Sequence, residues 1–439
     1  LRHTFAVGPD LAVDCSDTTQ VVEGVVRAVG ENVALVEDLD APSPSFPEET
    51  WRALRDEFDE VVFPTDSLYF GGPADIDGNG RIVVLFTPEV NRLTPRSATG
   101  RIGGFFLPLD LTDSGDPEGS GLQGPGGEVC PASNEGELLY LAAADPEGEF
   151  GSPLREDQAL RNARSVAAHE LEHLLSAEQR LVFGDAAFDE LGEVWLQEGL
   201  AHVAEEVVGL RLMDLAPGEN IGWDEIEGDR RQLDRFNTFH LDNFARLDLF
   251  MRQPTAAPVL ATADPGGAAG LQMRGFAWSL LRWAADAEGG DREEVELFRS
   301  LSRGGPSHLS GVENLEQAVG RSWADLLGDY RLALALDDTG VDGVPADLGF
   351  ATWDIRSVFA GLSENASSGD SFPFRFPLAV TELPVETTAV DFDVRPGTAA
   401  YFRVQGADGT GPASVRLAGQ SRLRLDDRIE PQLSVIRTR

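Results

Sequence analysis

The stretch RSVAAHELEHLLSAEQRLVFGDAAFDELGEVWLQEGLAHVAEE, residues 164–206, decides how the rest of the chain is interpreted. Its first half repeats apolar residues at the spacing of an α-helix and contains a His-Glu-x-x-His pattern formed by His169, Glu170 and His173. Side chains four residues apart lie on the same face of a helix, so the two imidazoles project together. We predict that this face binds one metal ion.

Zinc suits such a pair, because imidazole nitrogens bind it at about 2.0 Å and a catalytic site combines three protein ligands with one position for water. We expect the third ligand to be Glu198, which lies 25 residues after His173 in a Trp-x-x-Glu-Gly segment on a second helix. Glu170 is poorly placed for ligation and well placed to act as a general base. The alternative is an amphipathic helix whose histidines are solvated or hydrogen-bonded in the core.

The segments HELEH (169–173) and WLQEGLAH (195–202) resemble the gluzincin metallopeptidases, most closely the secreted bacterial hyicolysin-type family. Three further stretches share the resemblance: DIDGNGRIVVLFTPEVN (75–91), SNEGELLYLAAAD (133–145) and RGFAWSLLRWAAD (274–286). Together they cover roughly residues 20–290. The resemblance implies a zinc endopeptidase in which His169, His173 and Glu198 bind the ion and Glu170 is the catalytic acid and base.

Other functions remain as alternatives. A zinc aminopeptidase would need an acidic anchor for the substrate's amino group, and no G-x-M-x-N-like segment precedes the metal helix. A non-catalytic surface-binding protein on the same scaffold would have no need of Glu170. A serine hydrolase is disfavoured, because the chain contains no G-x-S-x-G pattern.

The chain departs from the gluzincin pattern just after Glu198. In thermolysin-like members an aspartate four residues after the glutamate ligand orients a zinc-bound histidine, and that position is His202 here. Another acceptor must then fix the histidine tautomer. The candidates are Asp185, Asp189, Glu205 or a backbone carbonyl.

A second departure concerns the donor for the oxyanion of the tetrahedral intermediate. Relatives often have a Tyr before the glycine that aligns with Gly275, and this chain has Arg274. A guanidinium is able to donate to an oxyanion or to bind a substrate carboxylate. His240 and Tyr140 are rival donors, and an ordinary structural role is an equal alternative for all three. The resemblance also implies an edge strand that pairs with the substrate backbone, at Leu138, Leu139 and Tyr140.

The segment Asp75-Ile-Asp77-Gly-Asn79-Gly80 matches the first half of a calcium loop, with oxygen-bearing side chains at positions 1, 3 and 5. Position 12 is Phe86 instead of the usual Glu. We therefore expect either a calcium site at Asp75, Asp77 and Asn79 that other groups complete, or a turn that simply leads into a strand.

The pattern along the chain predicts an α+β protein. Residues 20–38 alternate like a β-hairpin, and RIVVLFTP (81–88) is typical of a buried strand. Helical periodicity dominates from residue 154, and we expect the metal-binding helix at residues 157–182. Short β-prone runs follow residue 345 and are typical of a β-sandwich. We expect a zincin-like protease domain, made of a small mixed β-sheet subdomain (1–150) and a helical subdomain (151–344), followed by a C-terminal β-sandwich (345–439).

The charge of the chain excludes some classes of binding partner. The chain has 75 acidic and 35 basic residues and a net charge of −40, and every basic residue is Arg. Such a surface repels nucleic acid and anionic lipid, so we expect neither as a partner. The resemblance to metallopeptidases implies a peptide or protein substrate, and we expect a monomer. Adaptation to salt and a GC-biased genome are equal explanations of the acidity.

Other sequence features agree with export. No run of 18 apolar residues predicts a membrane span. Cys15 and Cys130 are the only cysteines, and they predict either a disulfide or two unlinked buried thiols. The sequence opens directly into polar residues, so we expect the mature form of a secreted protein.

Overall fold

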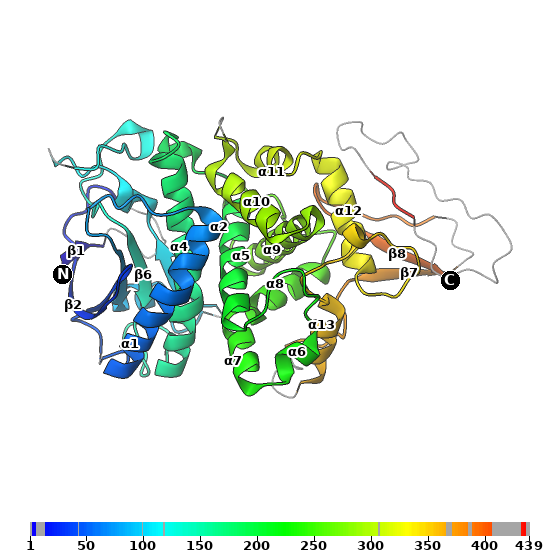
Figure 1. The fold of residues 1–439 in the computed structure, drawn as a ribbon, viewed down its shortest axis with the longest axis horizontal. Coiled ribbons are helices and arrows are strands. Elements are labelled where there is room, and N and C mark those ends of the chain that lie inside the picture. Colours follow the sequence, from blue (N-terminus) through cyan, green and yellow to red (C-terminus); the bar gives the residue numbers. More distant parts are fainter. Residues whose placement is uncertain are drawn as a thin grey trace.

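The computed structural model of the chain describes residues 2–5, 14–42, 44–98, 100–116, 119–305, 308–365, 371–384, 389–405 and 432–435. A β-sheet with its covering helices forms one part of the molecule, and a bundle of helices lies beside it (Figure 1). The long helix α4 (Glu156–Leu181) stands between the two parts.

The sheet has six strands in the order β1-β2-β3-β4-β6-β5. Their bounds are β1 (Arg2–Thr4), β2 (Val21–Val29), β3 (Val33–Asp38), β4 (Ile82–Thr87), β5 (Gly104–Phe106) and β6 (Leu138–Ala142). β3, β4 and β6 are parallel, whereas β1, β2 and β5 pair antiparallel with their neighbours. The predicted hairpin is confirmed as β2–β3, and the predicted buried strand is confirmed as β4, in which every residue is buried.

The position of β6 in the sheet differs from the prediction. The predicted edge strand at residues 138–141 is an interior strand, since β6 pairs with β4 on one side and β5 on the other. All five residues of β6 are buried, which is the pattern of a strand covered on both faces. The edge of the sheet on this side is the three-residue strand β5.

Helices make up most of the rest. α1 (Glu48–Glu57) and α2 (Phe63–Phe70) are joined by the π-helical segment Phe58–Val62. The further α-helices are α3 (Pro88–Arg92), α5 (Val194–Leu212), α6 (Trp223–Glu227), α7 (Arg230–Phe239), α8 (Leu241–Met251), α9 (Gly267–Glu288), α10 (Asp291–Arg303), α11 (Gly311–Val319), α12 (Trp323–Leu336) and α13 (Ile355–Glu364). Short 3₁₀ turns occur at Pro108–Leu111, Pro125–Gly127, Phe188–Glu190 and Ala346–Leu348.

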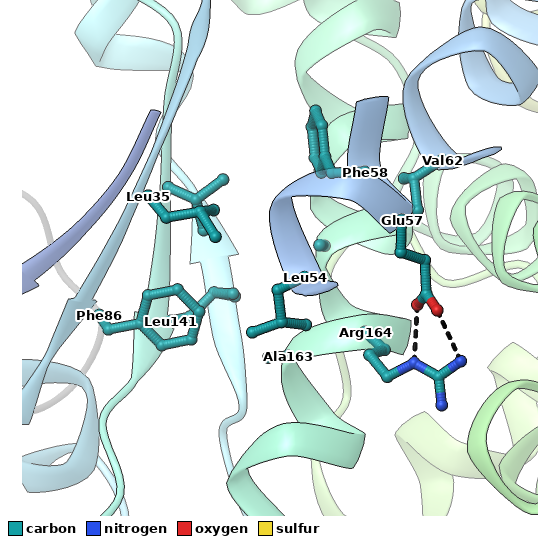
Figure 2. A pocket seen from close by; sticks show the side chains of 11 residues that line it. Leu35, Leu54, Glu57, Phe58, Val62, Phe86, Leu141, Ala163 and Arg164 are labelled. Carbon is teal, nitrogen blue, oxygen red and sulfur yellow. Dashed lines mark hydrogen bonds and ion pairs between the residues drawn. The ribbon is translucent and has the colours of Figure 1, made fainter. Parts of the chain in front are cut away.

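Apolar side chains join the sheet to α1 and α4. Those that face one another in this layer are Leu35, Phe86 and Leu141 from the strands and Leu54, Phe58 and Ala163 from the helices (Figure 2). At the edge of the layer, Arg164 of α4 donates two hydrogen bonds to the Glu57 carboxylate, at 2.6 and 2.8 Å. This two-point pair links α4 to the end of α1.

α4 is the element on which the candidate site depends. Glu156 and Asp157 occupy its first turn, where carboxylates interact favourably with the helix dipole. From Ala167 to Leu181 every residue except His173 is buried, because the helix is packed between the sheet and α5. The predicted helix at 157–182 is therefore confirmed to within one residue at either end.

The C-terminal part differs from the expected β-sandwich, which the described residues do not show. They contain α13 and one pair of parallel strands, β7 (Val380–Pro384) and β8 (Tyr401–Gln405). The Trp353 indole donates to Glu206 of α5 at 2.5 Å, and α13 packs on α6. Residues 345–364 thus join the helical part, and the predicted boundary at 345 falls inside it. Residues 406–431 of the predicted sandwich lie outside the described residues.

Two further expectations concern export. Cys15 and Cys130 form the predicted disulfide, which links residues 115 apart in the sequence. Among the helices that the structure describes, none combines the length and apolarity needed to span a bilayer.

Candidate metal centre

Two helices bring the predicted metal ligands together. α4 supplies His169 and His173, and α5 supplies Glu198. One nitrogen of each imidazole and one oxygen of Glu198 lie within 4.8 Å of one another. Gly199, the next residue of α5, lets this helix pack closely on α9, because a β-carbon there would lie only 3.0 Å from Ala277 of α9. The residue after the predicted ligand therefore packs directly on α9.

One pair of donor atoms has the separation expected around a zinc ion. Tetrahedral coordination with bonds of about 2.0 Å separates neighbouring ligand atoms by about 3.3 Å. The distance from His169 Nε2 to Glu198 Oε2 is 3.4 Å. Glu198 Oε2 is buried, and no hydrogen-bond partner reaches it within the described part of the chain. A buried carboxylate oxygen without a partner costs free energy, which a cation at this point would offset.

The surroundings of His169 attract positive charge. Burial lowers the pKa of the His169 imidazole, but the neighbouring carboxylates of Glu198, Glu205 and Glu170 outweigh burial and raise it to about 10. The same carboxylates would attract a divalent cation, which must displace this proton in order to bind the imidazole.

Each histidine also has a carboxylate on its outer nitrogen. The Nδ1–H of His169 donates to Glu205 at 2.7 Å, and the Nδ1 atom of His173 lies 3.3 Å from Glu172. Contacts of this kind fix the tautomer and turn Nε2 toward a metal. Glu205 is one of the acceptors that the sequence left open, whereas Glu172 was missed because it looks like an ordinary helical residue.

His202, the residue that replaces the usual aspartate, takes part indirectly. Its Nδ1–H donates to the same oxygen of Glu205 at 3.1 Å, and the ring is completely buried. Burial lowers the pKa of His202 to about 3, so the imidazole is neutral. Burial alone would raise the pKa of Glu205, but His202 and His169 hold it well below its usual value. Glu205 is therefore ionised between two imidazoles.

Glu170 is held by the edge strand. Its Oε2 atom accepts a hydrogen bond from the backbone N–H of Phe106 in β5, at 2.9 Å. β5 comes this close because Gly104 has no β-carbon, which would lie 2.5 Å from the Tyr140 carbonyl and 2.8 Å from Val166 of α4. This contact is not predictable from the sequence, because β5 is too short to show an alternating pattern.

Arg274 is engaged with the predicted third ligand. Its Nη2 atom donates to Glu198 Oε1 at 2.8 Å and to Asp264 at 3.0 Å. Burial would raise the pKa of Glu198, but Arg274 first and His169 next lower it well below its usual value. These hydrogen bonds indicate that Arg274 holds Glu198 in place. They do not favour the predicted role of Arg274 as oxyanion donor.

The two rival oxyanion donors are core residues. His240 is fully buried, with its ring 5.1 Å from Trp353 and 5.8 Å from Phe236. Tyr140 is also fully buried, and its hydroxyl donates to Asp110 at 2.7 Å. Neither side chain faces a cleft, so both predictions are corrected. Aromatic rings pack against both side chains, and a single sequence does not reveal such neighbours.

The predicted substrate-binding residues are corrected in the same way. Leu138 and Leu139 are buried within β6, together with Tyr140, and their backbones pair with β4. The main chain that borders Glu170 belongs to β5 instead.

The predicted calcium residues are only partly assembled. Oxygens of Asp75 and Asp77 lie within 4.8 Å of each other and of Glu137, which the sequence interpretation did not include. Asn79 donates its side-chain amide to Asp77, so its nitrogen faces that carboxylate. The arrangement differs from a calcium loop that uses positions 1, 3 and 5.

Comparisons with known proteins point to one reaction class. No family model matches the chain. Over 155 residues it is 28% identical to the neutral metalloprotease ShpI of Staphylococcus hyicus, a match that covers 35% of this chain and 30% of that protein. The chain thus spans less than a third of the length of the curated relative that it matches. The similarity supports a place among the metallopeptidases.

Proposed function

We propose that this chain is a secreted zinc endopeptidase of the gluzincin type, in which His169, His173 and Glu198 hold the ion and Glu170 is the catalytic base and acid. The observation that carries the proposal is the convergence of two imidazole nitrogens and one carboxylate oxygen next to Glu170 on the same helix. Similarity to a neutral metalloprotease supports the same reaction class.

Bound zinc supplies Lewis acidity, which lowers the pKa of water and polarises a peptide carbonyl. Glu170 takes the proton from the attacking water and passes it to the departing amine. The Phe106 N–H donates to Oε2 of this carboxylate at 2.9 Å and so orients it for both transfers.

The remaining polar residues hold the ligands in place. Glu205 accepts a hydrogen bond from the outer nitrogen of His169, and Arg274 donates to the outer oxygen of Glu198. Glu172 lies 3.3 Å from the outer nitrogen of His173. These contacts direct His169 Nε2 and Glu198 Oε2 to the same point. A carboxylate behind a ligating histidine also makes the imidazole a stronger base, which favours metal binding.

We propose that the substrate backbone pairs with strand β5 of the protein. Because the Phe106 N–H points from the unpaired edge of the sheet to Glu170, an extended peptide that pairs with this edge would pass the catalytic carboxylate. Main-chain pairing of this kind accepts many different side chains, as an endopeptidase requires. The Cys15–Cys130 disulfide supports function in an oxidising compartment outside the cell.

The decisive experiment compares zinc content and casein cleavage for the wild type and Glu170→Gln. Loss of a general acid and base is expected to lower the cleavage rate about 10²- to 10⁴-fold, with zinc retained. Glu156→Gln is the matched control, because Glu156 is exposed in the first turn of the same helix. Equal cleavage by the wild type and Glu170→Gln would remove this residue from the mechanism.

Peptides with blocked ends separate the endopeptidase from an aminopeptidase. An internally quenched peptide with an acetylated N-terminus and an amidated C-terminus is expected to be cleaved, because β5 would bind the backbone on both sides of the cleaved bond. Cleavage that requires a free amino group would instead support the aminopeptidase alternative.

A further inference from the structure

A second group of carboxylates lies beside the C-terminal half of α4, away from the candidate zinc ligands. The loop of residues 71–81, between α2 and β4, brings Asp75 and Asp77 next to Glu137, with oxygens of all three within 4.8 Å of one another. Glu178 of α4 is in direct contact with Glu137. Glu137 immediately precedes β6, so the group joins a loop, a strand and the helix that carries His169 and His173.

Both glutamates are buried, and each accepts one hydrogen bond from a backbone N–H of the loop. Glu137 Oε1 accepts from the Ile76 N–H at 2.6 Å, and Glu178 Oε2 accepts from the Ala74 N–H at 3.0 Å. Their second oxygens, Glu137 Oε2 and Glu178 Oε1, are buried, and no amide, hydroxyl or guanidinium donor reaches them within the described residues.

Asp75 lies between Ala74 and Ile76, the two residues whose backbone N–H groups donate to the glutamates. Its backbone has φ of 58°, which is unfavourable for a residue other than glycine. Its side chain accepts from the Gly80 N–H at 2.7 Å, which folds the loop around the carboxylate. A strained turn that collects acidic side chains without a basic partner needs a compensating interaction.

The described residues supply no arginine or histidine cation that pairs with this group. None of the ion pairs formed by the described residues includes Asp75, Asp77, Glu137 or Glu178. Burial, followed by the neighbouring Glu137, raises the pKa of Glu178 well above its usual value. Either a proton shared by the two glutamates or a bound cation must therefore relieve the repulsion.

We propose that Asp75, Asp77, Glu137 and Glu178 bind one divalent cation of the calcium class and so fasten the 71–81 loop to α4. Calcium prefers six to eight oxygen ligands, including carboxylates, in a flexible arrangement. The four side chains offer oxygen donors from three separate elements, and the absence of imidazole and thiolate from this set disfavours zinc. The site differs from the loop expected from the sequence, because two buried glutamates replace Asn79.

The site is independent of the proposed peptidase activity, so its test uses stability and binding as readouts. The protein is a zinc-loaded Glu170→Gln full-length chain, which avoids self-cleavage, dialysed against calcium-free buffer that contains zinc. Addition of about 1 mM CaCl₂, an appropriate range for an extracellular site, is expected to raise the thermal midpoint by about 3–5 °C. Isothermal titration with CaCl₂ is expected to give one site per chain, and MgCl₂ a smaller effect.

Glu137→Gln and Glu178→Gln, each in the same background, separate a cation from a shared proton. Both variants are expected to lose the calcium-dependent rise, yet to be at least as stable as the parent without calcium, because each removes a buried charge. Glu147→Gln, at an exposed glutamate, is the matched control and keeps the full rise. Absence of any calcium effect on the parent, or an undiminished rise in both glutamine variants, overturns the proposal.

Discussion

Arg274 Nη2 lies 2.8 Å from Glu198 Oε1, so the guanidinium holds one oxygen of this carboxylate while the other oxygen faces an imidazole. Glu198 Oε2 is 3.4 Å from His169 Nε2. Asp264 accepts a second hydrogen bond from the same guanidinium nitrogen at 3.0 Å and keeps it in place. A chain of contacts thus runs from the start of α9 to the candidate metal site on α4 and α5.

This relationship predicts that Arg274 supports zinc binding. Arg274→Gln is expected to weaken the affinity for zinc about 10- to 100-fold, because the outer oxygen of Glu198 loses its partner. Arg274→Lys keeps the charge without the planar fork and is expected to lose less. Competition with a chromophoric chelator measures the affinities. Arg292→Gln, at an exposed arginine, is the control, and equal zinc affinity in Arg274→Gln and this control would contradict the prediction.

The acceptors behind the two histidines are expected to contribute unequally. Glu205 accepts from His169 at 2.7 Å, whereas Glu172 lies 3.3 Å from the His173 nitrogen. The shorter contact orients its imidazole more firmly, so Glu205→Gln is expected to weaken zinc binding more than Glu172→Gln, within the range of about 10- to 100-fold. The same chelator competition compares the two isosteric changes. The reverse order would show that these distances do not govern ligand orientation.

The contact between Phe106 and Glu170 predicts a main-chain effect on catalysis. Phe106→Pro removes the N–H that donates to Glu170, whereas Phe106→Ala removes the aromatic ring and keeps the N–H. Because this N–H points away from β6, the proline leaves the pairing between β5 and β6 in place. We expect kcat to fall at least about 10-fold further in the proline variant than in the alanine variant. Initial rates on the blocked peptide test this, and identical rates would mean that the contact has no catalytic role.

The burial of His240 leads us to expect that the protein loses stability in acid. Burial lowers its pKa from 6.5 to about 3, so the folded protein keeps the imidazole neutral while the unfolded chain takes up a proton. The contribution is fully present above pH 6.5 and is lost as the pH falls toward 3. Between pH 7.5 and 5 the free energy of unfolding is expected to decrease by about 2 kcal/mol from this residue.

Urea unfolding of His240→Leu provides the comparison for this acid effect. Leucine is of similar size and cannot be protonated, so the variant is expected to lose about 2 kcal/mol less than the parent over the same pH range. Both proteins carry Glu170→Gln, which prevents self-cleavage. Identical pH dependence in the two would show that the imidazole is protonated in the folded state.

Local patterns predict the long elements well. The helical spacing around His169 and His173 locates α4 to within one residue, and the unbroken apolar run at 81–88 locates β4. In both segments burial and local preference favour the same structure, so the sequence alone is informative. The cysteine pair is predicted for a similar reason, because two cysteines allow only one intramolecular bond.

Contacts between distant segments are not predictable in this way. β5 escapes detection because three residues in a glycine-rich stretch show no periodicity, although its backbone holds Glu170. Trp353 precedes a helix in a region whose β-prone composition favoured strands, and its packing against α5 decides the outcome. Glu137 and Glu178 lie 41 residues apart in the sequence, and only the fold of the 71–81 loop reveals that they share one site.

X-ray absorption spectroscopy at the zinc edge tests the central claim most directly. For the purified wild-type chain we predict one zinc ion with nitrogen and oxygen neighbours at about 2.0 Å and the scattering of two imidazoles. In Glu198→Ala, zinc is expected to bind more weakly and the spectrum to keep the imidazole signal with one fewer protein oxygen. A wild-type spectrum without imidazole scattering, or one that is unchanged when His169 and His173 are replaced by alanine, would contradict the account.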